Sequence, residues 1–290
     1  MPKPKIICVV GPTASGKTGY AISLAKKMNG EVVSCDSMQI YQQMTIGTAK
    51  PTKEEMQGIP HHMMDIVSPK TNYSVAEFVT DAKRSIDDIL ARGKVPILCG
   101  GTGLYIDSLL NGICFDDDVC DEVYRDELKV LAEQEGNEAV HALLREADPK
   151  AAEEIHPNNV KRVIRTLEII KTTGKTKEEY DRDSRGEPCY DATIYGMEWE
   201  REELYRRIDL RVDTMIEQGL VEEVKSLLNY GIPKDSTAMQ AIGYKELIAY
   251  LEGDCTLEKA IEIIKRETRR YAKRQLTWFR RNKDIIWVNP

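Results

Sequence analysis

The chain has 290 residues, of which 41% are hydrophobic and 31% charged, so it is long enough for one large globular domain or a domain with an insertion. Its formal net charge of −7 argues against indiscriminate binding to nucleic acid. No apolar stretch approaches the length of a membrane span, and the first residues show no signal-peptide pattern. We therefore expect a cytoplasmic, monomeric protein without a membrane partner.

A phosphate-binding loop is the first motif along the chain. It reads G-P-T-A-S-G-K-T and lies between an apolar run, Ile6–Val10, and a helical stretch. Its glycines let successive N–H groups point at one anion, Lys17 reaches the outer phosphates, and the Thr18 hydroxyl is a ligand for Mg²⁺. We predict that all eight residues bind a phosphate ester or anhydride: Gly11, Pro12, Thr13, Ala14, Ser15, Gly16, Lys17 and Thr18.

Strands and helices alternate through the first third of the chain. Apolar runs predict strands at Ile6–Val10, Glu31–Cys35 and Val95–Cys99, and helical patterns at about 18–28 and 75–91 lie between them. Alternation of this kind is typical of parallel βαβ units. The predicted fold is therefore an α/β, P-loop NTPase-like parallel sheet that binds its ligand at the carboxyl ends of the strands.

Two of these strand ends carry candidate chemistry. Asp36 directly follows the second strand, so it should lie beside the phosphate loop as a base or a metal partner; a turn-capping carboxylate is the alternative. The third strand runs into Cys99-Gly100-Gly101-Thr102-Gly103 and has no acid where nucleotide hydrolases commonly hold Mg²⁺. This absence weakens an ATPase interpretation and indicates a phosphate that leaves or is donated.

The pattern changes to helices alone between residues 115 and 191. A strand at Thr193–Trp199 then returns the chain to the α/β pattern, and helices fill most of the remainder. We predict a core formed by residues 1–114 and 192–290, with an inserted helical domain at 115–191. In the inserted part, a helix over 159–172 has an apolar side and a basic side, and the basic side would ordinarily be a solvated face.

Arg211 is the least expected residue of the helical half. It projects from the middle of an apolar stripe on the helix predicted over 201–218. Burying a guanidinium requires an anionic partner, so a carboxylate or a ligand phosphate should face it. A structural ion pair and a ligand clamp are equally consistent with this pattern.

The last long helix is basic on one side. Between Lys265 and Lys283 the chain has nine Lys or Arg residues and one acid, Glu267, and aromatic residues are interleaved with them. Such a face suits RNA phosphates and stacked bases, although a solvated charged helix is the alternative. The adjacent pair His61 and His62 lacks further ligands at metal-binding spacing, so we expect a loop role for it.

Long sequence blocks resemble the tRNA dimethylallyltransferases, also called tRNA isopentenyltransferases. Besides the phosphate loop they are D-S-M-Q-I-Y-Q-Q-M-T-I-G-T-A-K-P-T from Asp36, P-H-H-M-M-D-I from Pro60, C-G-G-T-G-L-Y-I from Cys99, Q-A-I-G-Y-K from Gln240 and T-R-R-Y-A-K-R-Q-L-T-W-F-R from Thr268. They occur in family order over nearly the whole chain. The chain resembles the bacterial form, because it ends soon after Trp287 without the zinc-finger extension of eukaryotic relatives.

The resemblance implies transfer of a dimethylallyl group from dimethylallyl diphosphate to the exocyclic amine of the adenosine just 3′ of a tRNA anticodon. It implies that Asp36 accepts a proton from the amine, that Arg211 and Thr18-bound Mg²⁺ stabilise the leaving diphosphate, and that Thr102 is catalytic. The family pattern assigns these residues to tRNA binding: Asp36, Ser37, Met38, Gln39, Thr102, Arg125, Lys161, Arg162, Val163, Ile164, Arg165, Gln240, Gly243, Tyr244, Lys245, Lys273, Arg274, Gln275, Trp278 and Arg280.

Three other functions fit parts of the sequence. A P-loop small-molecule kinase would use the phosphate loop but leave the basic helix without a role. An adenylate isopentenyltransferase would share the chemistry but modify a free nucleotide. A non-catalytic RNA-binding module would use the basic helix but leave the phosphate loop and Asp36 unexplained.

Overall fold

The structure is a computed structural model that describes residues 2–114 and 121–289. The chain divides into two compact units. The first comprises the residues up to Leu110 and those from Pro188 onward, and the second comprises Asn111–Glu187. The insertion predicted at 115–191 has boundaries close to those of the second unit.

The first unit is built on a parallel sheet. In the described part of the chain this sheet has six strands in the order β3-β2-β4-β1-β5-β6. Their bounds are β1 (Lys5–Val10), β2 (Gly30–Ser34), β3 (His61–His62), β4 (Val95–Gly100), β5 (Asp191–Met197) and β6 (Ile286–Val288). Residues 6–10 of β1 are all buried, as expected for a central strand covered on both faces. The predicted parallel α/β fold is confirmed.

Eight helices of the described chain belong to the first unit. They are α1 (Lys17–Met28), α2 (Lys53–Met56), α3 (Val75–Ala91), α4 (Gly103–Leu110), α10 (Arg201–Glu217), α11 (Leu220–Asn229), α12 (Tyr244–Leu251) and α13 (Leu257–Phe279). Local sequence sets several of their ends. Ser74 and Glu77 form a capping box that begins α3, and Asn29, whose φ of 51° is left-handed, caps the C-terminus of α1 after Met28.

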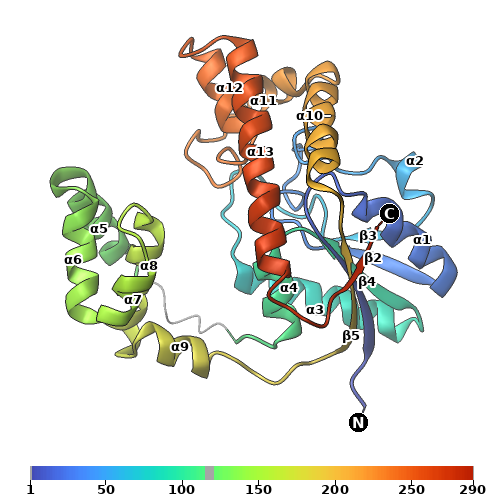
Figure 1. Cartoon of the computed structure of the whole chain (residues 1–290), viewed down its shortest axis with the longest axis horizontal. Coiled ribbons are helices and arrows are strands. Elements are labelled where there is room, and N and C mark those ends of the chain that lie inside the picture. Colours follow the sequence, from blue (N-terminus) through green and yellow to red (C-terminus); the bar gives the residue numbers. More distant parts are fainter. Residues whose placement is uncertain (1, 115–120, 290) are drawn as a thin grey trace. The chain divides into compact units, whose positions relative to one another are not determined.

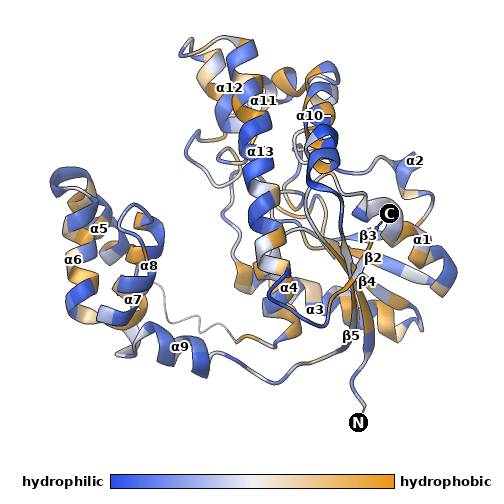
Figure 2. Cartoon of the chain, in the orientation of Figure 1, coloured by the Kyte–Doolittle hydropathy of each residue, from blue (hydrophilic) through white to orange (hydrophobic). Residues whose placement is uncertain are grey.

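Helices α10 and α13 run side by side above the carboxyl ends of the strands (Figure 1). Much of the α13 ribbon has the colour of hydrophilic residues (Figure 2), whereas the small and apolar residues Ala260, Ile264, Ala272 and Phe279 are buried. This amphipathic pattern holds α13 against the core. It also leaves a polar face next to the strand ends that carry the phosphate loop and Asp36.

The second unit is helical. It contains α5 (Glu122–Glu135), α6 (Asn137–Ala147), α7 (Pro149–Glu154), α8 (Val160–Thr173) and α9 (Lys177–Asp183). Buried aliphatic residues of α5, α6 and α8, among them Leu128, Leu144 and Leu167, form its own core. Within residues 2–114 and 121–289, no helix combines the length and the apolar character that crossing a membrane requires.

Candidate active site

The phosphate loop leaves the central strand β1 and turns directly into α1. Ala14 has a φ of 62° and Gly16 a φ of 86°, so both residues adopt the left-handed backbone region. The Lys17 amine donates to Pro12 O at 2.6 Å, and Gln275 Oε1 of α13 accepts from Thr13 N at 2.8 Å. Burial and, to a smaller extent, the nearby charge of Arg211 lower the pKa of Lys17 to about 8, although the charge of Asp36 acts in the opposite direction. A bound anion would offset both effects.

Asp36 follows β2 and uses one of its two carboxylate oxygens in a turn. Its Oδ1 accepts from Met38 N at 2.9 Å and from Gln39 N at 3.4 Å. Asp36 therefore caps this turn, which is the alternative role that the sequence indicated. It leaves Oδ2, which forms no hydrogen bond with any residue in the described ranges, for another partner.

Arg211 is half-buried on α10. Its Nη1 lies 3.5 Å from Thr13 Oγ1, and it forms no ion pair with a carboxylate in the part of the chain that the structure describes. Burial lowers the pKa of Arg211, and the charge of Arg207 adds to this effect. A half-buried cation without a carboxylate partner favours the ligand clamp over the structural ion pair.

Two neighbouring cavities meet at Asp36 and Arg211. We call the first, of about 240 Å³, the phosphate cavity, because residues 13–18 of the phosphate loop line it. The second, of about 380 Å³, is lined by the predicted residues Ser37, Met38, Gln240, Gly243, Lys245 and Arg274. Both cavities share Thr13, Asp36, Thr48, Arg211 and Tyr271. The loop, Asp36 and Arg211, far apart in the sequence, therefore meet at one site.

Thr102 lies beside the same strand ends. Its Oγ1 accepts from Ser37 N at 3.0 Å and thereby joins the turn after β4 to the turn after β2. The glycines next to it allow close packing of α13. A Cβ on Gly101 would lie 2.1 Å from the Gln275 amide, and a Cβ on Gly103 would lie 2.3 Å from the Trp278 ring.

Two residues of α13 that the family pattern assigns to tRNA binding make hydrogen bonds within the protein. Gln275 is 5% exposed and bridges the loop and the turn, since its amide donates to Gly101 O at 2.9 Å. Trp278 is half-buried and donates to Asp107 Oδ2 at 2.7 Å. These contacts dock α13 on the site and leave neither polar group facing outward.

Tyr244 is also buried, contrary to its expected place on a tRNA-binding surface. Its hydroxyl donates to Glu223 at 2.7 Å. The same carboxylate accepts from the backbone of Thr45, Ile46 and Gly47 at 2.9, 2.7 and 3.0 Å. Glu223 and Tyr244 therefore fix the loop whose next residue, Thr48, lines both cavities.

Sequence reasoning missed two further residues of the site. His61 was expected in a loop role, but its ring lines the phosphate cavity; Nδ1 donates to Ile59 O at 2.8 Å, and Nε2 has no partner in the described chain. Burial lowers the pKa of His61. Tyr271 of α13 also lines both cavities, and burial together with the charge of Asp36 raises its pKa. A polar hydroxyl among the apolar residues of this helix was the available signal for Tyr271.

The basic face of α13 is less uniform than its sequence suggests. Lys265 pairs with Asp213 at 2.6 Å and Arg269 pairs with Asp209, both acids of α10. Lys273 and Arg274 remain exposed, and within residues 2–114 and 121–289 they have no carboxylate partner. The charge count along α13 did not include the acidic residues that α10 contributes to the same surface.

In the second unit, part of the predicted RNA-binding segment forms core or ion pairs. Val163 and Ile164 are buried, whereas Lys161 and Arg162 are exposed. Arg125 and Arg165 each contact Glu168 at 2.6 Å. Burial raises the pKa of Glu168, but hydrogen bonds from Asp121 N and from both arginines bring it below its ordinary value. Val163 and Ile164 are therefore structural.

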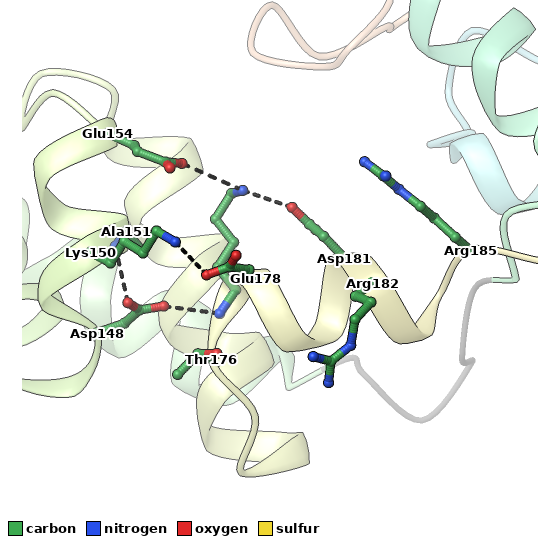
Figure 3. Close-up of a pocket in the computed structure, with 10 residues that line it drawn as sticks. Asp148, Lys150, Ala151, Glu154, Thr176, Glu178, Asp181, Arg182 and Arg185 are labelled. Atoms are coloured by element: carbon green, nitrogen blue, oxygen red, sulfur yellow. Dashed lines mark hydrogen bonds and ion pairs between the residues drawn. The ribbon is translucent and has the colours of Figure 1, made fainter.

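A hollow of about 460 Å³ lies between α7 and α9 of the second unit (Figure 3). Lys177 lies 3.9 Å from Glu154 and 2.7 Å from Asp181, and Lys150 lies 2.5 Å from Glu178. Asp148 accepts from Ala151 N and Lys177 N. Because its lysines already have carboxylate partners, this hollow resembles a structural ion-pair network more than an anion site.

Comparison with known proteins identifies the family. The family model described as IPP transferase matches residues 39–282, which is most of the chain. The chain belongs to the IPP transferase family. Among curated IPP transferases, it is similar to the tRNA dimethylallyltransferases of Acetivibrio thermocellus, with 50% identity over 98% of this chain and 91% of the relative, and of Bacillus anthracis, with 52% identity over 100% and 92%.

Solved IPP transferase structures agree with this assignment. The full-length tRNA isopentenylpyrophosphate transferase from Bacillus halodurans aligns with a TM-score of 0.74 and 49% identity, over 99% of this chain and 90% of that chain. A eukaryotic dimethylallyltransferase acting on tRNA aligns with a TM-score of 0.84 and 35% identity, over 99% of this chain and 74% of that chain. The predicted family and core fold are thus confirmed.

Proposed function

We propose that this protein transfers a dimethylallyl group from dimethylallyl diphosphate to N6 of the adenosine 3′-adjacent to a tRNA anticodon, and releases diphosphate. One observation carries the proposal beyond family membership. Asp36, an acid, and Arg211, a cation without a carboxylate partner among the described residues, lie on the wall shared by the phosphate cavity and the second cavity. A transfer between two substrates requires such a wall, at which the two reacting groups meet.

The phosphate cavity is suited to the diphosphate. Backbone N–H groups of the loop, the Lys17 amine and the Arg211 guanidinium would bind the phosphate oxygens and absorb the charge that develops as diphosphate leaves. Mg²⁺ keeps several waters and takes few protein ligands, so the Thr18 hydroxyl, which lines this cavity, would hold it together with the phosphates. The ion would supply further charge neutralisation.

The second cavity is suited to the acceptor adenine. Apolar side chains of α10 and α13, including Val212, Met215 and Ile264, line it together with polar groups. An adenine stacked in an anticodon loop cannot enter such a pocket, so it would be flipped out. As N6 attacks the allylic carbon, the carbon–oxygen bond to diphosphate breaks and Asp36 Oδ2 accepts the N6 proton.

Exposed cations beside the second cavity would hold the tRNA. Lys245 and Arg274 line its rim, and Lys273 is exposed on the same helix as Arg274. In the second unit, Lys161 and Arg162 are the exposed cations of the predicted segment. Cations at these positions would contact RNA phosphates. We propose that the enzyme acts as a monomer in the cytoplasm, where tRNA is found.

In the decisive assay, the full-length protein is incubated with Mg²⁺ and labelled dimethylallyl diphosphate. Unmodified tRNA and AMP are offered as acceptors in separate reactions. Label should enter tRNA, and RNase digestion should release it in a modified adenosine next to the anticodon. Matched tRNA with guanosine at that position is the control and should remain unlabelled. Label in AMP alone would make the protein an adenylate isopentenyltransferase. Labelling of neither acceptor would contradict the proposed transfer.

A further inference from the structure

Trp199 and Arg207 contact the outer side of the phosphate loop. Trp199 lies between β5 and α10, and Arg207 lies on α10; neither was predicted to be functional. Trp199 Nε1 donates to Ser15 O at 3.0 Å, and Arg207 Nε donates to Ala14 O at 3.0 Å. Two consecutive carbonyls of the loop are therefore held by side chains that follow the same strand.

These contacts matter because of how such a loop binds an anion. Its N–H groups bind phosphate only when they point inward, so the intervening carbonyls must point elsewhere. Ala14 and Ser15 are 5% and 0% exposed, so a protein donor has to satisfy their carbonyls. Ala14 also has a left-handed φ of 62°, which a non-glycine residue rarely adopts without support from its surroundings.

The two donors form one stacked unit. The Arg207 guanidinium lies over the Trp199 ring at 4.3 Å, and each group restrains the other. Arg207 has no carboxylate partner in the described part of the chain, unlike its neighbour Arg206, which binds Glu203 at 2.8 and 2.9 Å. Among the described residues, no carboxylate therefore neutralises the positive charge of Arg207 beside the loop. The Arg207 guanidinium lies close to Gly16 of the loop, 4.0 Å from the position that a Cβ on this glycine would take.

We propose that Trp199 and Arg207 are positioning residues for the diphosphate. They hold the Ala14 and Ser15 carbonyls outward, so that the loop N–H groups remain aimed into the phosphate cavity before the substrate arrives. Arg207 adds a second guanidinium charge near that of Arg211. This inference rests on the proposed function of the phosphate cavity as the diphosphate site.

Two substitutions in the full-length protein test the inference. Trp199→Phe keeps an aromatic ring under Arg207 but removes the N–H donor, and Arg207→Lys keeps the charge but removes the planar group that stacks and donates. Arg206→Lys is the matched control, because Arg206 is exposed and contacts Glu203 alone among the described residues. Binding of inorganic diphosphate with Mg²⁺ is measured by titration calorimetry, and folding by melting temperature.

We expect Trp199→Phe to weaken diphosphate binding about five-fold, the usual net effect of one lost hydrogen bond. Arg207→Lys should weaken it about ten-fold or more, since it loses a charge-assisted bond and the stack. Both should raise KM for dimethylallyl diphosphate and leave tRNA affinity unchanged. Arg206→Lys should bind diphosphate like the wild type.

Three results would overturn the inference. Wild-type diphosphate affinity in both variants, with Lys17→Ala impaired, would refute the positioning role and leave the proposed function intact. A lowered melting temperature with unchanged affinity would make the pair purely structural. Unchanged affinity in Lys17→Ala as well would show that diphosphate binds elsewhere, and the proposed function of the phosphate cavity would fail together with the inference.

Discussion

Arg211→Lys separates a diphosphate clamp from a structural cation. The side chain is half-buried, its one hydrogen bond in the described chain is a 3.5 Å contact with Thr13, and it lacks a carboxylate partner there. Lysine retains the charge but loses the planar fork that binds two phosphate oxygens at once. The substitution should therefore change the stability of the folded protein little, whereas the bound transition state loses a charge-assisted hydrogen bond.

The magnitudes follow from these contacts. A hydrogen bond to a charged group contributes about 1.5–3 kcal/mol, so kcat/KM for dimethylallyl diphosphate should fall roughly 10- to 150-fold. Because the 3.5 Å contact is weak, the free energy of unfolding should change by no more than about 0.5 kcal/mol. Single-turnover rates and melting curves measure the two effects. A normal rate in a protein with a lowered melting temperature would refute the clamp.

Two further predictions concern the substrates separately. Burial lowers the pKa of Lys17 to about 8, and a bound diphosphate favours its charged form, so affinity for an unreactive thio analogue of dimethylallyl diphosphate should fall as pH rises above about 8. Affinity that is constant between pH 7 and 9.5 would contradict this role of Lys17. Lys273→Glu with Arg274→Glu should weaken tRNA binding and reduce the slope of log K against log salt by about 1.5, without changing binding of the analogue. An unchanged slope would make these residues solvated surface.

Much of the core could be predicted because its signals are local. The apolar runs at Ile6–Val10 and Val95–Cys99 are central strands, and the capping box at Ser74 begins α3 as expected. Strands β3 and β6 were not predicted, since runs of two or three residues show no periodicity. Their pairing depends on the register of the neighbouring strands β2 and β5.

The site was predicted only in part, because several of its residues act through long-range contacts. The phosphate loop and Asp36 follow strands and could be placed at the same sheet edge from the sequence. The family pattern assigns Gln275 and Tyr244 to tRNA binding, yet both are buried, since glycines at 101 and 47 allow close approach of their side chains. Sequence spacing does not show which side of a helix meets a glycine of a distant loop.

The charge of the α13 surface also depends on contacts that the sequence of this helix does not show. Its sequence has one acid among nine basic residues, but α10 supplies Asp209 and Asp213 to two of them. A charge count along one helix describes its surface only if no neighbouring helix contributes charges. Here α10 was correctly predicted as a helix, while its contact with α13 is a property of the fold.

The proposed mechanism depends most on Asp36 as the proton acceptor, and Asp36→Asn tests this role most directly. Asparagine keeps an oxygen that can accept from Met38 N and Gln39 N, so the turn after β2 should survive, while the second oxygen is replaced by an amide that cannot accept a proton. The measurement is the single-turnover rate of dimethylallyl transfer to pre-bound tRNA at saturating diphosphate substrate. We predict a fall of roughly 10² or more, with tRNA affinity unchanged. A rate equal to that of the wild type would contradict the assignment of Asp36 as the base.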